Sequence, residues 1–115
     1  EYQAGPSPRQ KEIAQELAQA GAVLIWGHHP HVLQPSDWLQ TDDGSTLVFY
    51  SLGNALFDSY GLADTSRSAL ILVTLDTQGV NEVQIVPFEI DTTKSCIVPA
   101  DLSIGQNILQ RLNLP

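Results

Sequence analysis

The sequence has little of several features that define whole classes of protein. A single cysteine, Cys96, excludes an internal disulfide, so the fold is not a disulfide-stapled scaffold. Lysine and arginine number 5 against 13 aspartates and glutamates, which gives a formal net charge of -8. A surface of that sign repels phosphate backbones, so we expect no nucleic-acid partner. Apolar runs such as residues 22–26 are far shorter than the roughly 20 residues that a transmembrane helix needs.

What is present suits one globular domain. The chain has 115 residues, of which 43% are hydrophobic and 16% charged, enough apolar material for a core. We therefore predict a single domain over residues 1–115. The first eight residues are polar and rich in proline, and they lack the basic start and apolar middle of a signal peptide. Cys96, beside Ile97 and Val98, is more typical of a small buried hydrophobe than of a nucleophile.

A helix is predicted near the start of the chain. Ser7 can cap it, Pro8 suits its first position, and Gln10 can reach back as in a capping box. Gly21 can take the left-handed conformation that ends helices. One apolar face follows from residues at helical spacing, namely Ile13, Ala14, Leu17 and Ala18.

The segment after this helix, residues 22–26, is apolar throughout and does not alternate. A strand of this kind is usually covered on both faces, as in parallel α/β sheets. Strands are further predicted over residues 37–41, 46–50, 68–76 and 80–90, with turns at 42–45 and 77–79 and a loop at 61–67. Pro87 indicates an edge strand or a bulge.

A final helix is predicted over residues 104–112, with one apolar face formed by Ile104, Ile108, Leu109 and Leu112. The fold class is therefore α/β, with one helix–strand unit followed by mostly antiparallel strands and a terminal helix. The chain opens on a helix without the strand that should precede it. We expect it to be the C-terminal part of a larger domain.

All three histidines of the protein lie within four positions, at His28, His29 and His31. They follow a buried strand, and in open α/β sheets ligands bind just beyond the carboxyl ends of strands. Gly27 allows the backbone to turn or approach closely there. Pro30 is predicted to push His29 towards an extended conformation, in which residues two apart point to the same side. His29 and His31 would then share one side, and His28 would face away.

Neutral imidazole is a common ligand for transition metals, and His-x-His supplies two ligands compactly. A catalytic zinc normally takes about three protein ligands plus water, so further ligands are required. The candidates in this chain are Glu1, Asp37, Asn54 and Asp58. The competing interpretation is a polar loop whose histidines only cap a strand or a helix.

A second motif, Ser51-Leu52-Gly53-Asn54, also follows a predicted strand. We expect Ser51, Gly53 and Asn54 to line the same pocket as the histidines, with Asn54 forming hydrogen bonds. An ordinary turn is the alternative, because Gly-Asn is typical of turns. Ser51 lacks the Gly-x-Ser-x-Gly context of a serine hydrolase.

Two stretches carry a family resemblance: residues 27–35, Gly-His-His-Pro-His-Val-Leu-Gln-Pro, and residues 49–54, Phe-Tyr-Ser-Leu-Gly-Asn. Together they resemble the bacterial capsule-synthesis CapA family, which is linked to poly-γ-glutamate capsules. Glu1-Tyr2 is similar to the end of that family's His-Trp-Gly-x-Glu-Tyr motif. The distinctive part of the match covers residues 1–58.

This family is similar in turn to calcineurin-like metallophosphatases, which are four-layer α/β/β/α sandwiches with a two-metal centre. The resemblance implies that His29 and His31 match the last two histidine ligands, with His28 in the neighbouring position and Glu1 as the acidic ligand. It implies catalytic roles for His29 and His31 and divalent cofactors such as Mn, Fe or Zn. The family's amino-terminal Asp and Asn ligand motifs are not in these 115 residues, so we expect the chain to be inactive alone.

The resemblance implies a role in capsule or poly-γ-glutamate biosynthesis, in a parent protein that could be a metal-dependent hydrolase. The implied partners are the capsule polymer or a small phosphorylated substrate, with other capsule-synthesis proteins as further candidates. An extracytoplasmic or membrane-associated location in bacteria is implied as well. Two alternatives stay open: a non-catalytic polymer-handling or scaffold module with a degenerate metal site, and a general metal-dependent phosphoesterase.

Overall fold

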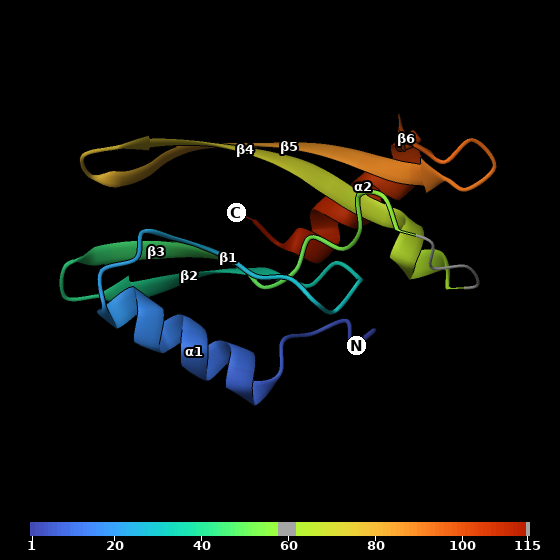
Figure 1. The fold of residues 1–115 in the computed structure, drawn as a ribbon. Helices are drawn as coiled ribbons and strands as arrows, with labels where there is room; N and C mark the ends of the chain where they lie inside the picture. The colour runs from blue at the N-terminus through green and yellow to red at the C-terminus, as the bar shows by residue number, and fades with distance from the viewer. Residues whose placement is uncertain (58–61, 115) are drawn as a thin grey trace.

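The computed structural model describes residues 1–57 and 62–114, and it has the predicted mixed α/β composition (Figure 1). A helix–strand unit is followed by mostly antiparallel strands and a terminal helix, as expected. The elements in chain order are α1 (Pro8–Gln19), β1 (Leu24–Trp26), β2 (Ser36–Thr41), β3 (Gly44–Phe49), the 3-10 helix η1 (Ala63–Ser66), β4 (Arg67–Asp76), β5 (Gly79–Asp91), β6 (Cys96–Pro99) and α2 (Leu102–Leu112).

Helix α1 begins and ends as its sequence predicts. The Ser7 hydroxyl accepts from the Gln10 backbone N–H at 3.2 Å, and the Gln10 side chain accepts from the Ser7 N–H at 2.8 Å, which completes the capping box. Gly21 follows the helix with a φ of 93°. The buried face of α1 is narrower than predicted, since Ala14 and Ala18 are buried whereas Ile13 and Leu17 are exposed.

The first sheet has the strand order β1-β3-β2 and is covered on one face by α1 (Figure 1). Strand β1 runs parallel to β3, and β2 forms an antiparallel hairpin with β3 through the two residues Asp42 and Asp43. Strand β1 is covered on both faces, as expected, because Leu24 packs against the core between the sheets and Ile25 against the cluster under α1, although Trp26 at its end is 41% exposed. Within the described residues, β1 is an edge strand that pairs on one side only.

The second sheet has the order β4-β5-β6 and is antiparallel throughout. The prediction for Pro87 is wrong, because Pro87 lies on the central strand and the irregular register falls between Thr74 and Leu75. The Pro87 carbonyl accepts from Ala100 N–H at 3.2 Å, on the side of β6. A residue's nitrogen and oxygen point to the same side of a strand, so the missing N–H costs no bond to β4.

Strand β6 was not among the predicted elements, and its first residue, Cys96, is half-buried instead of fully buried. The segment from residue 61 to 67 was predicted as a loop. Its described part contains η1, and Arg67 already belongs to β4. Gly61 lies outside the described residues.

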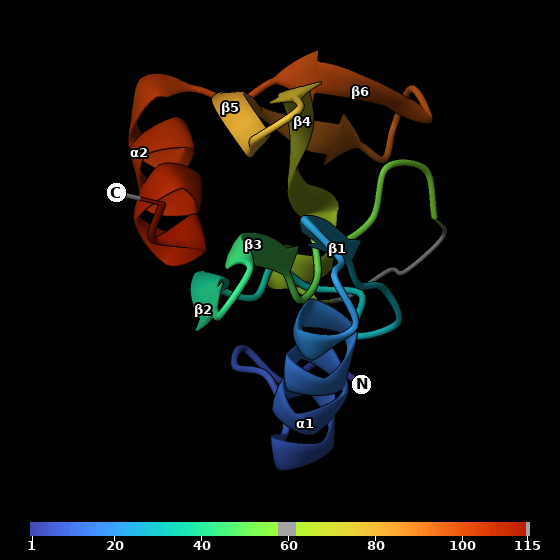
Figure 2. The same cartoon turned by 90° about the vertical axis from the view of Figure 1, so that its left-hand side faces the viewer.

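The two sheets stack against each other, and α2 lies beside them at one flank (Figure 2). The described residues therefore form a helix–sheet–sheet stack, in which α2 closes the side and does not cover the outer face of β4-β5-β6. Of its predicted face, Ile108 and Leu112 are buried, Ile104 is half-buried, and Leu109 is exposed. Neither α-helix in this described part of the chain is long and apolar enough to cross a membrane.

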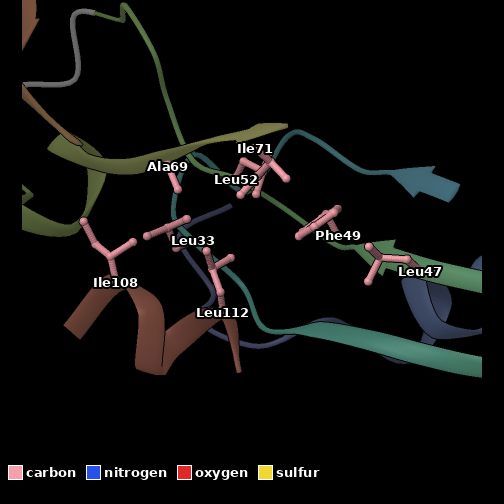
Figure 3. Close-up of a cluster of buried hydrophobic side chains, with 8 residues drawn as sticks. All are labelled: Leu33, Leu47, Phe49, Leu52, Ala69, Ile71, Ile108 and Leu112. Carbon is pink, nitrogen blue, oxygen red and sulfur yellow. The ribbon is translucent and has the colours of Figure 1, made fainter. Parts of the chain in front are cut away.

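The core lies where both sheets and α2 meet (Figure 3). It consists of buried apolar side chains from five parts of the chain, namely Leu33, Leu47, Phe49, Leu52, Ala69, Ile71, Ile108 and Leu112. The Ser36 hydroxyl donates to the Leu112 carbonyl at 2.6 Å and ties the end of α2 to β2. The core thus fixes the ends of β1 and β3, from which the candidate site projects.

Candidate metal centre

The site begins at Gly27, where the ends of two parallel strands come together. The Gly27 N–H donates to the Phe49 carbonyl at 2.7 Å, and a Cβ at Gly27 would overlap the Tyr50 carbonyl oxygen. Only glycine permits this close approach, as the sequence predicted. Because β1 and β3 are parallel neighbours, the loops that follow them leave the sheet side by side.

The histidine loop, which we define as residues 27–35, makes a tight turn at its histidines and is not an extended segment. His29 has a φ of 95° and His31 a φ of 61°, so the prediction of an extended His29 is wrong. The preference of a residue before proline is a bias that tertiary contacts can override. Here Pro30 is buried, and its carbonyl accepts from the Tyr2 N–H at 2.8 Å.

Despite this different backbone, His29 and His31 converge on one point together with Glu1. One ligand atom from each of the three residues lies within 4.8 Å of the other two. The His29 and His31 ring centroids are 6.2 Å apart. His28 is exposed and is not part of this group.

The donor set of this group suits a divalent transition metal. Two imidazoles and a carboxylate are ligands that Zn, Fe and Mn accept. Ligand bonds of about 2.0–2.2 Å place two ligand atoms of one metal at most about 4.4 Å apart. The ligand atoms of Glu1, His29 and His31 all lie within 4.8 Å of one another, so their spacing is compatible with one shared ion.

The second motif, residues 51–54, packs directly against the histidine loop. Asn54 is buried, and its Oδ1 lies 2.8 Å from His31 Nδ1. An isolated β-bridge between Leu33 and Leu52 and a hydrogen bond of 3.0 Å from the Gln34 N–H to the Ser51 carbonyl also join the two loops. Ser51 is fully buried, and its hydroxyl accepts from the Gly53 N–H at 3.2 Å, so it stabilises the turn instead of lining a pocket.

An open cleft of about 420 Å³ lies beside the site. The three histidines line it together with Gly53 and Asn54. The facing wall comes from the second sheet, including residues 68–70 and Phe88. A smaller cleft of about 230 Å³ borders Glu1 and His29 on the other side. Glu1 and His29 therefore stand beside open space that a ligand could enter.

Of the predicted ligand candidates within the described residues, Asp37 is not brought to this point. Asp58 lies outside the described residues. Asp37 is exposed on β2 and is not in the group of three.

Burial raises the pKa of the Tyr50 hydroxyl, and the negative charge of Asp37 raises this pKa further, so Tyr50 stays neutral.

Three contributors to the site were not predicted from the sequence. The Tyr2 and Phe57 rings lie on His31, with centroid distances of 6.1 and 4.5 Å. Gln34 is buried and donates to the carbonyls of Gln3 and Gly5 at 2.9 and 3.0 Å. The only sequence signal was position, because all three residues lie within or beside the motifs already singled out.

Fold and site together define an α/β protein with a histidine–carboxylate group at the ends of two parallel strands. The chain belongs to the family of the bacterial capsule synthesis protein PGA_cap, whose model matches residues 1–59. The expected CapA-type family is thereby confirmed.

Two curated relatives extend this comparison. The chain is 37% identical over 112 residues to the PGA biosynthesis protein CapA of Bacillus subtilis (strain 168). This match covers 97% of the chain and 28% of that protein. It is 43% identical over 90 residues to the capsule biosynthesis protein CapA of Bacillus anthracis, covering 78% of this chain and 21% of that protein. The matched residues therefore span only 28% and 21% of the lengths of these two relatives.

Proposed function

We propose that this chain is part of a protein of capsule or poly-γ-glutamate biosynthesis, in which Glu1, His29 and His31 hold a divalent metal ion. The names of the two relatives support the capsule role. The convergence of one carboxylate and two imidazoles supports the metal role, and it is the observation that carries the proposal. We also propose that the chain lies within a larger domain, that this domain holds a second metal ion, and that it acts on a substrate of capsule or poly-γ-glutamate biosynthesis.

The chemistry that suits such a centre is hydrolysis or group transfer. Three protein ligands leave coordination positions for water and substrate, and a metal bound there would acidify water and polarise a scissile bond. The residues of this chain would orient and expose the centre: Asn54 and Phe57 fix His31, and the cleft beside them admits a substrate. Both an amide of the polymer and a phosphorylated intermediate are compatible with this chemistry.

Metal binding to the full-length protein tests the proposal. After chelation, the protein is titrated calorimetrically with Mn²⁺ or Zn²⁺. Loss of a residue that only supports a ligand typically weakens metal binding roughly 10- to 100-fold. We expect His29→Gln and His31→Gln each to weaken binding by more than this, because each removes a ligand. His28→Gln provides the comparison and should keep the affinity, because His28 lies outside the group of three.

The results also separate the alternatives. If the full-length protein binds no metal stoichiometrically, and if capsule production survives the double substitution of His29 and His31 by glutamine, the non-catalytic scaffold module is the interpretation that remains. Chelator-sensitive turnover of a generic phosphate ester would instead favour the phosphoesterase.

A further inference from the structure

Asn54 makes three directional contacts from a side chain that is only 6% exposed. Its Nδ2 lies 3.2 Å from the His31 carbonyl oxygen and 3.0 Å from the Thr65 carbonyl oxygen. Its Oδ1 lies 2.8 Å from His31 Nδ1. The amide therefore bridges the histidine loop, the second motif and the segment before β4.

These contacts determine which ring nitrogen of His31 carries the proton. Carbonyl oxygens only accept hydrogen bonds, so the side of Asn54 that faces two of them must be its amide nitrogen. The amide oxygen then faces the ring, and it can only accept. His31 must donate from Nδ1, and because neutral imidazole has a single N–H, the lone pair is on Nε2.

We propose that Asn54 is a positioning residue, which holds His31 as the Nδ1–H tautomer and presents Nε2 as the metal ligand. The part that concerns the metal rests on the proposed function, whereas the tautomer does not. The Phe57 and Tyr2 rings lie beside the His31 ring, at 4.5 and 6.1 Å between centroids. Free histidine in water favours the opposite tautomer, so its selection here depends on the protein.

Nitrogen NMR of metal-free full-length protein tests the tautomer directly. Histidine rings are labelled with ¹⁵N, the His31 signals are assigned by their loss in His31→Gln, and spectra are recorded at a pH where the ring is neutral. We expect the Nδ1–H pattern for His31. Asn54→Ala should shift the population towards Nε2–H, whereas Asn54→Asp, which keeps an acceptor at the ring, should retain Nδ1–H. Asn107→Ala, on the exposed face of α2, is the matched control and should change nothing.

An Nε2–H signal for His31 in the unsubstituted protein would overturn the proposal, even if Asn54→Ala failed to fold. An unchanged Nδ1–H pattern in a folded Asn54→Ala protein would also overturn it.

Zn²⁺ or Mn²⁺ titration of the same variants separates this inference from the proposed function. We expect Asn54→Ala to weaken binding about 10- to 100-fold, with partial rescue in Asn54→Asp. Full affinity in Asn54→Ala would refute the role of Asn54 towards the metal. If the unsubstituted protein bound no metal but showed the Asn54-dependent tautomer, the proposed function would fail and the assignment of the tautomer would stand.

Discussion

At the scale of single residues, the site is built from backbone conformations that most side chains tolerate poorly. Among the described residues, five non-glycine residues have positive φ, and Tyr2, His29 and His31 are three of them. Such conformations cost about 1–3 kcal/mol each when strained, and they persist where the surroundings enforce them. Their concentration beside Glu1 supports a functional role for this turn.

Gly27 provides a residue-scale prediction. Gly27→Ala would drive a methyl group into the Tyr50 carbonyl, and we expect a loss of about 1–3 kcal/mol in the free energy of unfolding, as for other overpacked sites. The measurement is urea denaturation followed by circular dichroism.

Gly105→Ala is the matched control for this substitution. A Cβ at Gly105 meets only the Pro87 side chain, at 3.8 and 3.9 Å, and Gly105 lies inside α2. Alanine should therefore stabilise the chain by about 0.5–1 kcal/mol. Equal midpoints for the two variants would contradict the close approach of β1 and β3.

At the scale of elements, buried amides connect segments that the sequence separates. Gln34 accepts from the Gln10 side chain at 2.8 Å and donates to the carbonyls of Gln3 and Gly5. It therefore joins α1, the histidine loop and the N-terminal arm, which we define as residues 1–6. Because Glu1 is on this arm, the geometry of the candidate ligand group depends on Gln34.

Gln34→Met keeps the length of the side chain and removes all three hydrogen bonds. We expect the N-terminal arm to become mobile, with lower ¹H–¹⁵N heteronuclear NOE values for residues 2–5. The free energy of unfolding should fall by about 1–3 kcal/mol, because three hydrogen bonds of a buried amide are lost and each is typically worth about 0.5–1.5 kcal/mol. Gln40→Met, at an exposed position on β2, is the control and should leave the arm ordered. Unchanged NOE values in Gln34→Met would show that the Tyr2–Pro30 hydrogen bond is sufficient to hold the arm.

At the scale of the whole molecule, the two sheets are held together by one core, and α2 closes that core from the side. Ile108 is 1% exposed and Leu112 is fully buried, whereas the neighbouring Leu109 is 44% exposed. The orientation of α2 is thus a specific feature that single substitutions can examine.

Ile108→Ala should cost about 2–5 kcal/mol in the free energy of unfolding, because it leaves a cavity between both sheets and the helix. Leu109→Ala is the adjacent control and should cost less than about 1 kcal/mol, since much of its side chain already contacts water. Both values come from denaturant midpoints at equal slope. A larger loss for Leu109→Ala would mean that α2 presents another face to the core.

The tertiary structure, and not local pattern, decided which apolar residues are buried. Helical spacing placed Ile13 and Leu17 on the same face as Ala14 and Ala18, but only the two alanines of this set are buried. Periodicity defines a direction around a helix and not the width of the contact. Pro87 likewise lies on a central strand because its missing N–H faces the end of β6, which the sequence of β5 cannot reveal.

The sequence by itself determined the caps of α1, the hairpin, the α/β class and the two motifs at the strand ends, because these depend on near neighbours in the chain. Only the tertiary structure decided how the motifs meet. The position of Glu1 and the amide contacts of Gln34 and Asn54 join residues that are far apart in sequence. The turn at His29 and His31 is held by such contacts, from Tyr2 to the Pro30 carbonyl and from Asn54 to His31. Their energies depend on distances that no local pattern contains, so the histidines converge by a turn and not by the extended segment that the sequence predicted.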